Sequence, residues 1–126
     1  MLETIWFQAI PVNAIGPVLM GTLTNPNPAL YFVCEGGGFI KGIATWTVAP
    51  NVRMGTNGPT YNNISAGGTL TTNPLQGRNQ AQTALKAIPS GTQVYLYVST
   101  AGAISGPGTP VIDVYVTGQW VNLTSI

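Results

Sequence analysis

The chain is almost free of charged side chains. Among its 126 residues there are four Lys or Arg and three Asp or Glu, so 6% are charged, whereas an ordinary globular domain has about 25%. A nucleic-acid site needs several Lys or Arg to neutralise phosphates, and the net charge here is only +1. We therefore expect no nucleic-acid partner. Intrinsic disorder is also disfavoured, because disordered chains combine high charge with low hydrophobicity and this chain is 44% hydrophobic.

Histidine is absent, and the single cysteine is Cys34. Since histidine is the commonest general base and metal ligand, catalytic triads and zinc sites are excluded within this chain. The carboxylates Glu3, Glu35 and Asp113 could meet in the fold as a glycosidase pair, but we favour solvated side chains or partners of nearby cations. We expect no catalytic residue, no metal and no cofactor. Cys34 lies in an apolar run, which favours a buried thiol over a reactive one.

Long apolar runs are missing as well. The uncharged stretch from Thr4 to Cys34 is interrupted by Pro and Asn, and no run of about 18 apolar residues occurs. The first residues have no basic segment typical of a secretory signal. We expect no membrane partner, and synthesis in a cytoplasm.

What the chain does contain is the composition of strands and turns. Its 16 Gly and 10 Pro separate stretches rich in Thr, Val, Ile and aromatic residues, which is typical of an all-β domain. The pattern predicts strands near residues 2–10, 15–24, 29–34, 38–49, 68–72, 92–100 and 110–122, and it favours a strand over a helix for 79–88. We expect a single domain over residues 1–126, an antiparallel β-sandwich of jelly-roll type with about eight strands. A small closed barrel is the alternative.

Two predicted strands alternate clearly between apolar and polar residues. The apolar positions expected in the core are Val94, Leu96 and Val98 in one strand and Ile112, Val114 and Val116 in the other. The triplet Gly36-Gly37-Gly38 is expected to be a turn between two strands. It lacks the Lys and Ser/Thr of a phosphate-binding loop, so we expect no nucleotide site there.

Tyrosines occupy the opposite face of the same two strands. If these strands pair, their tyrosines are cross-strand neighbours, and tyrosine is favoured at protein interfaces. Residues 50–68 form an irregular loop or arm, which either is a plain surface loop or becomes ordered against a neighbouring subunit. The candidate interface residues are Tyr95, Tyr97 and Tyr115 from the strands and Asn57, Tyr61 and Asn62 from the arm. The alternative for the tyrosine face is simple packing under a loop or a second sheet.

A surface with so few ions favours assembly. A standard interface takes roughly 800 Å² from each partner, and few charges would need desolvation in such a patch. A free monomer with a net charge near zero is poorly protected against association. Without histidine, the surface also has little to titrate between pH 5 and 8, so we expect the assembly to tolerate changes of pH.

The general character of the chain resembles the small capsid decoration, or cement, proteins of tailed bacteriophages. The resemblance includes the short length, the Gly-, Thr- and Asn-rich strands, and an expected closing hairpin of Gly91–Val98 with Val111–Val116. It implies a β-sandwich that sits as a dimer or trimer on the major capsid protein and braces the shell. The protein would then be located on the capsid surface of a virion.

A carbohydrate-binding β-sandwich, such as a tail-fibre or lectin-like module, is the competing hypothesis. The tyrosines, or Trp6 and Trp120, could stack on sugar rings while Asn and Thr supply hydrogen bonds. An exposed aromatic platform favours this alternative, and aromatic residues buried between subunits favour the decoration protein.

Overall fold

The structure is a computed structural model that describes residues 2–41, 46–70 and 77–123. This part of the chain forms β-strands and no α-helix. The strands are β1 (Glu3–Pro11), β2 (Gly16–Leu23), β3 (Tyr31–Lys41), β4 (Trp46–Val48), β5 (Asn51–Gly55), β6 (Ser65–Thr69), β7 (Gly77–Pro89), β8 (Thr92–Thr100), β9 (Ala103–Ile104) and β10 (Val111–Val121).

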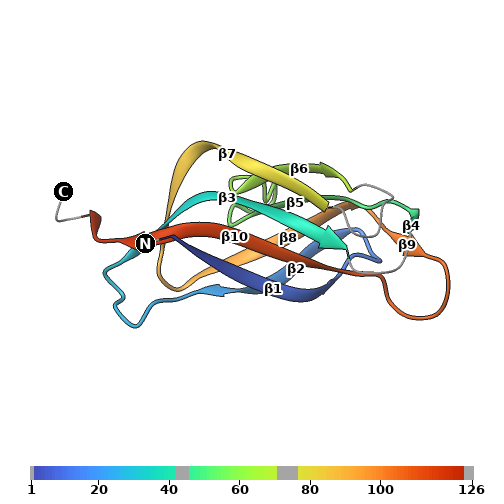
Figure 1. Cartoon of the computed structure of the whole chain (residues 1–126), viewed down its shortest axis with the longest axis horizontal. Helices are drawn as coiled ribbons and strands as arrows, with labels where there is room; N and C mark the ends of the chain where they lie inside the picture. The colour runs from blue at the N-terminus through green and yellow to red at the C-terminus, as the bar shows by residue number, and fades with distance from the viewer. Residues whose placement is uncertain (1, 42–45, 71–76, 124–126) are drawn as a thin grey trace.

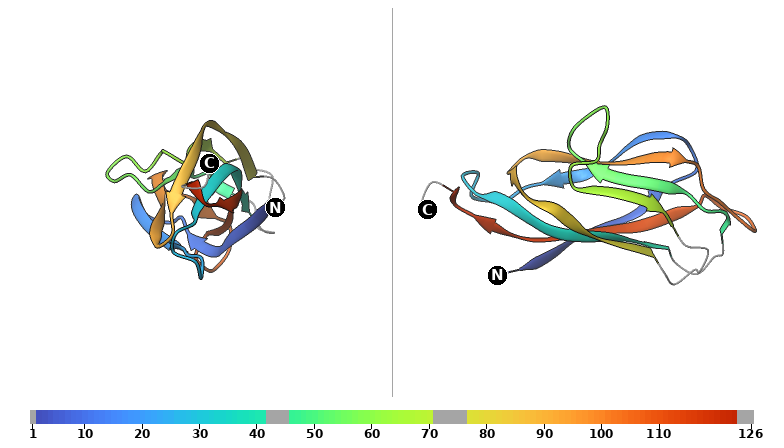
Figure 2. Two further views of the ribbon diagram at one scale, coloured as in Figure 1. Left: turned by 90° about the vertical axis from the view of Figure 1, so that its left-hand side faces the viewer. Right: turned by 90° about the horizontal axis from the view of Figure 1, so that it is seen from above.

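The long strands form two four-stranded antiparallel sheets that face each other (Figure 1). Sheet I has the order β1-β10-β3-β7, and sheet II has the order β2-β8-β5-β6. The short strands β4 and β9 pair as a separate ribbon. The strands surround a common interior, as the end-on view in Figure 2 shows. The predicted all-β, antiparallel, sandwich-like fold is confirmed.

The pairing of the strands is nested. The innermost pair is β5 with β6, followed outward by β3 with β7, β2 with β8, and β1 with β10. This nesting is compatible with the jelly-roll topology suggested by the sequence, which stays a prediction. It also separates β8 from β10, which lie in different sheets. The expected hairpin of Gly91–Val98 with Val111–Val116 is therefore wrong, because each of these strands pairs with an earlier strand of the chain.

The core lies between the sheets and follows the period-two alternation of the strands. The six apolar positions predicted from the sequence are all buried: Val94, Leu96 and Val98 on sheet II, and Ile112, Val114 and Val116 on sheet I. Phe32, Phe39 and Met54 are among the largest fully buried side chains. Cys34 is buried among them, as expected.

The glycine triplet lies inside a strand instead of forming a turn. β3 runs through Gly36, Gly37 and Gly38 without interruption, so the strands expected at 29–34 and 38–49 are joined. A Cβ on Gly37 would lie 2.5 Å from the backbone oxygen of Tyr115. The absence of a side chain at Gly37 thus permits the close approach of β10. In the sequence alone, the same glycines look like a turn that ends the strand.

The stretch expected to be irregular, residues 50–68, contains the strands β5 and β6. Only the connection between them is a loop, and we call residues 56–64 the β5–β6 loop. It stands out from the body of the molecule in both views of Figure 2. The strand favoured at 79–88 is confirmed as part of β7. Parts of two further predicted strands, at 42–45 and 71–72, lie outside the described residues.

Candidate functional site

Tyr95 and Tyr97 lie on the outer face of sheet II. They alternate along β8 with the buried Val94, Leu96 and Val98, so their rings point away from the core. Each has an apolar neighbour on β2, because Tyr95 is in register with Leu19 and Tyr97 with Pro17. Leu19 is 49% exposed. The outer face of sheet II therefore presents an apolar and aromatic surface.

Tyr61 of the β5–β6 loop folds over these two tyrosines. Its ring centroid lies 4.9 Å from that of Tyr95 and 6.1 Å from that of Tyr97, with an angle of only 17° between the planes of Tyr61 and Tyr97. A Cβ on Gly58 would lie 2.8 Å from the hydroxyl oxygen of Tyr61, so the absence of a side chain there leaves room for the ring. The loop and the strand thus form one aromatic cluster, Tyr61-Tyr95-Tyr97.

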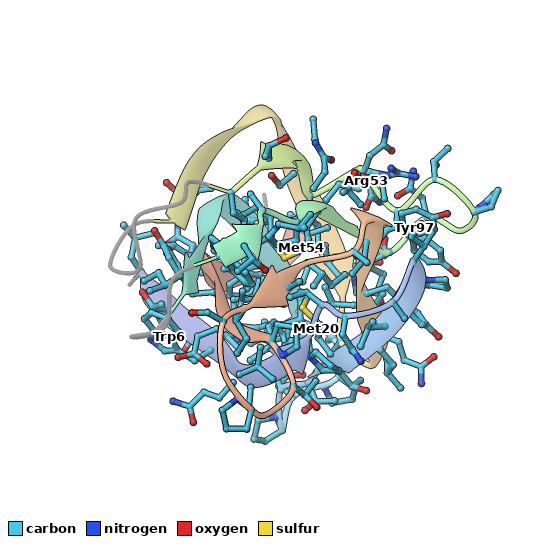
Figure 3. The ribbon with its side chains drawn as sticks, turned by 90° about the vertical axis from the view of Figure 1, so that its right-hand side faces the viewer. Trp6, Met20, Arg53, Met54 and Tyr97 are labelled. Carbon is cyan, nitrogen blue, oxygen red and sulfur yellow. The ribbon has the colours of Figure 1, made fainter. Side chains whose placement is uncertain are left out.

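Arg53 on β5 adds a cation to this cluster. Its guanidinium carbon lies 4.1 Å from the centroid of the Tyr97 ring, which is within the range of a cation–π interaction. Its Nε donates a hydrogen bond of 2.5 Å to the carbonyl oxygen of Thr60. Figure 3 shows Arg53 and Tyr97 together on one side of the molecule. Arg53 was not among the residues predicted from the sequence, although Val52 and Met54, which alternate with it, are the signal that would have indicated β5.

Asn57 organises the β5–β6 loop. Its Oδ1 accepts hydrogen bonds from the backbone amides of Asn62 (2.9 Å) and Asn63 (3.1 Å). Its Nδ2 donates to Thr60 Oγ1 (3.0 Å) and to Asn62 Oδ1 (2.9 Å). The backbone of Tyr61 has a left-handed φ of 49°, and its amide donates to the carbonyl oxygen of Asn57. Because left-handed backbone is unfavourable for a residue with a side chain, these hydrogen bonds are what hold Tyr61 in place.

Removing the Asn57 side chain is expected to loosen the loop. In Asn57→Ala the four side-chain hydrogen bonds are lost, each of which contributes about 0.5–1.5 kcal/mol. We expect limited proteolysis to cleave within residues 56–64 about tenfold faster or more, with mass spectrometry identifying the cuts.

Asn13→Ala is the matched control, because Asn13 is an exposed asparagine in the β1–β2 turn. It is expected to leave the cleavage pattern unchanged. Equal cleavage of Asn57→Ala and the unaltered protein would contradict the role assigned to Asn57.

Tyr115, which the sequence analysis grouped with Tyr95 and Tyr97, lies elsewhere. It is on β10 of sheet I, where it contacts Trp6 of β1 with ring centroids 4.9 Å apart. Figure 3 shows Trp6 on the side of the molecule opposite Arg53 and Tyr97, with Met54 between them. The expected cross-strand contact is wrong because β8 and β10 belong to different sheets. The other five candidate interface residues do come together on one side, through the aromatic cluster and the Asn57 network.

Trp120, the other tryptophan considered for sugar stacking, packs edge-on against the core residue Phe32 with ring centroids 5.2 Å apart. It is partly buried against the hydrophobic core. It does not form an exposed platform with Trp6.

Charged residues are distributed unequally between the sheets. Arg53 is the single charged residue on the strands of sheet II. The others are on strands of sheet I: Glu3 on β1, Glu35 and Lys41 on β3, Arg78 and Lys86 on β7, and Asp113 on β10. Arg53 lies between Lys41 and Arg78 in the sequence, so its separation from the other charges is a product of the topology. Covering sheet II with a partner would therefore remove water from fewer charged groups, and cost less free energy, than covering sheet I.

Nothing in residues 2–41, 46–70 and 77–123 forms a pocket or a group of three or more potential metal ligands. Glu3 pairs with Gly118 on β10, which is about 17 Å along the strand from Asp113. These two carboxylates are therefore too far apart to act as a glycosidase pair, whose carboxyl groups are at most about 9.5 Å apart. No helix in the described part of the chain is long and apolar enough to cross a membrane.

Comparison of the chain with protein-family models, curated proteins and solved structures finds no match. The function is therefore argued from the outer face of sheet II itself.

Proposed function

We propose that this protein is a structural virion protein that binds the outside of a phage capsid and bridges subunits of the major capsid protein. Sheet II is the face that contacts the shell, and the aromatic cluster Tyr61-Tyr95-Tyr97 lies at the centre of that contact. Copies of the protein itself, as a dimer or trimer, are further partners. In this proposal the protein is made in the host cytoplasm and is located on the capsid surface.

The observation that supports this proposal is the aromatic, nearly ion-free outer face of sheet II. Charged residues are depleted at the centres of protein interfaces, whereas Tyr and Arg are enriched there. Here Arg53 lies over the ring of Tyr97, one of the three clustered tyrosines, and it is also held by the carbonyl oxygen of Thr60. A cluster ordered before binding loses little conformational entropy on association.

The amount of surface also supports a protein partner. The accessible surface of the chain is 6450 Å², so an interface of roughly 800 Å² would use about an eighth of it. Pro17 and Leu19 extend the apolar surface beyond the tyrosines onto β2. Together with the β5–β6 loop, they make sheet II a broad contact face.

Electron microscopy of particles from the cells that make this protein naturally tests the proposal. We expect the two-sheet density of this chain on the outside of a regular shell, with sheet II directed toward the shell. Recovery of the chain as a free monomer, or with sheet II directed into solvent, would overturn the proposal.

Protection of the β5–β6 loop is a further expected result. If the loop contacts the shell, proteolytic cleavage within residues 56–64 is slower in the assembled protein than in the free chain. Comparison of the two digests by mass spectrometry measures this. Identical cleavage rates would exclude the loop from the contact.

A further inference from the structure

The aromatic pair Trp6-Tyr115 forms a second surface, on the outer face of sheet I. The two residues are cross-strand partners on β1 and β10, and their rings are tilted by 44° at a centroid distance of 4.9 Å. Trp6 is 48% exposed. Much of the indole is therefore accessible, although Tyr115 supports it from the side.

Next to this pair, positions on β1, β10 and β3 are occupied by threonine or glycine. On β3, the residue opposite Tyr115 is Gly38 and the residue opposite Thr117 is Gly36, so no side chain stands beside Tyr115 on that strand. Thr117 also lies opposite Thr4, and their hydroxyl oxygens are 3.5 Å apart. The threonines thus place hydroxyl groups next to the aromatic pair, and the glycines add no aliphatic side chain there.

Asp113 adds a hydrogen-bond acceptor near the pair. It lies two residues from Tyr115 on the same face of β10, about 7 Å along the strand. Its Oδ1 accepts a hydrogen bond of 2.9 Å from the amide of Ala9, which orients the carboxylate. A carboxylate accepts about four hydrogen bonds, and no described residue other than Ala9 donates to Asp113. Within the part of the chain that the structure describes, acceptor capacity is therefore left for a ligand.

We propose that this surface, Trp6-Tyr115 with Asp113, Thr4 and Thr117, binds a neutral sugar ring. A pyranose has C–H groups that pack on an aromatic face and hydroxyls that donate to a carboxylate and exchange hydrogen bonds with threonine hydroxyls. The carboxylate disfavours an anionic ligand, and the described residues offer no group of ligands for a metal ion.

The size of the surface favours a small ligand over a protein. The pair and its neighbours span three strands and three rows of residues, with two intervals of about 7 Å between the rows, or about 200 Å² from the spacing of strands and residues. That area fits one or two sugar rings and is well below the roughly 800 Å² that a protein partner takes. The inference is independent of the proposed function, because Trp6 and Tyr97 belong to different sheets and lie on opposite sides of the molecule (Figure 3).

Tryptophan fluorescence and NMR titration of the full chain test the inference. The probes are methyl β-D-glucopyranoside, methyl β-D-galactopyranoside and a β-linked glucose tetrasaccharide. We expect a change in tryptophan emission and shifts at Trp6 and Tyr115 for at least one probe, with a dissociation constant in the millimolar range, as is typical of small polar ligands. Because Trp46 is buried, it contributes little to a ligand-dependent change.

Trp6→Ala is expected to weaken binding about tenfold or more, and Trp6→Phe less, because the smaller ring keeps part of the contact. Ile15→Ala, at an exposed residue of the β1–β2 turn, is the control that keeps full affinity. No response to any probe in the millimolar range would overturn the inference. Binding that survives in Trp6→Ala would also overturn it. An emission change that depends on protein concentration alone would overturn it as well, because it would identify a second copy of the chain as the occupant.

Discussion

Tyr97→Ala is expected to weaken assembly by about 30-fold or more, which corresponds to about 2 kcal/mol. The ring of Tyr97 supports both Arg53 and Tyr61. Removal of the ring therefore leaves the Arg53 guanidinium without its aromatic partner. It also leaves the Tyr61 ring without its contact to Tyr97. The free energy of unfolding is expected to fall less, by about 1 kcal/mol, because these contacts lie on the outer face of the sheet. Sedimentation velocity measures the oligomer, and the occupancy of purified particles measures shell attachment.

Tyr31→Ala is the matched control for this variant. Tyr31 is a half-buried tyrosine on β3 of sheet I, so its truncation removes the same atoms from the other sheet. We expect it to leave assembly intact. An unchanged oligomer and full particle occupancy for Tyr97→Ala would reject sheet II as the contact face.

Leu96→Ala is expected to have the largest effect on stability. Leu96 is on β8 and is fully buried in the core. Truncation of such a leucine costs about 2–5 kcal/mol through lost burial and the cavity left behind, a large part of the 5–15 kcal/mol that stabilises an ordinary domain. Chemical denaturation of the free chain measures this loss.

Leu19→Ala makes the comparison within the same sheet. Leu19 lies on β2, next to Val18, which is in register with Leu96, but it faces outward. Its truncation is expected to change the free energy of unfolding by no more than about 0.5 kcal/mol, while it weakens association through the loss of apolar contact. If both variants lost the same stability, the assignment of the two faces of sheet II would be wrong.

The strands with strong alternation could be predicted from the sequence. Val94, Leu96 and Val98, like Ile112, Val114 and Val116, repeat with the period of a strand that has one buried face, and this pattern is local. β5 was missed because it is short and surrounded by Gly, Pro and Asn. Gly36, Gly37 and Gly38 were misread because a glycine in a turn and a glycine at a close approach between strands look the same in a sequence.

The candidate interface was predicted in part. Asn57, Tyr61 and Asn62 were grouped with Tyr95 and Tyr97, and the structure brings them together. Tyr115 was grouped with them because β8 and β10 are near in the sequence and have the same pattern. Its true neighbour is Trp6, from the opposite end of the chain. Arg53 was not included, because its significance depends on the ring of Tyr97 below it.

The sequence alone determined that the chain has few charged side chains, is built of strands and has no histidine for catalysis or metal binding. Composition and period-two alternation can be read along the chain without knowledge of which distant residues meet. Only the tertiary structure decided which strands share a sheet. The nested pairing places all charged residues except Arg53 on the strands of sheet I and separates the two aromatic surfaces. That arrangement depends on hydrogen bonds between strands far apart in the chain, and no local pattern encodes such pairings.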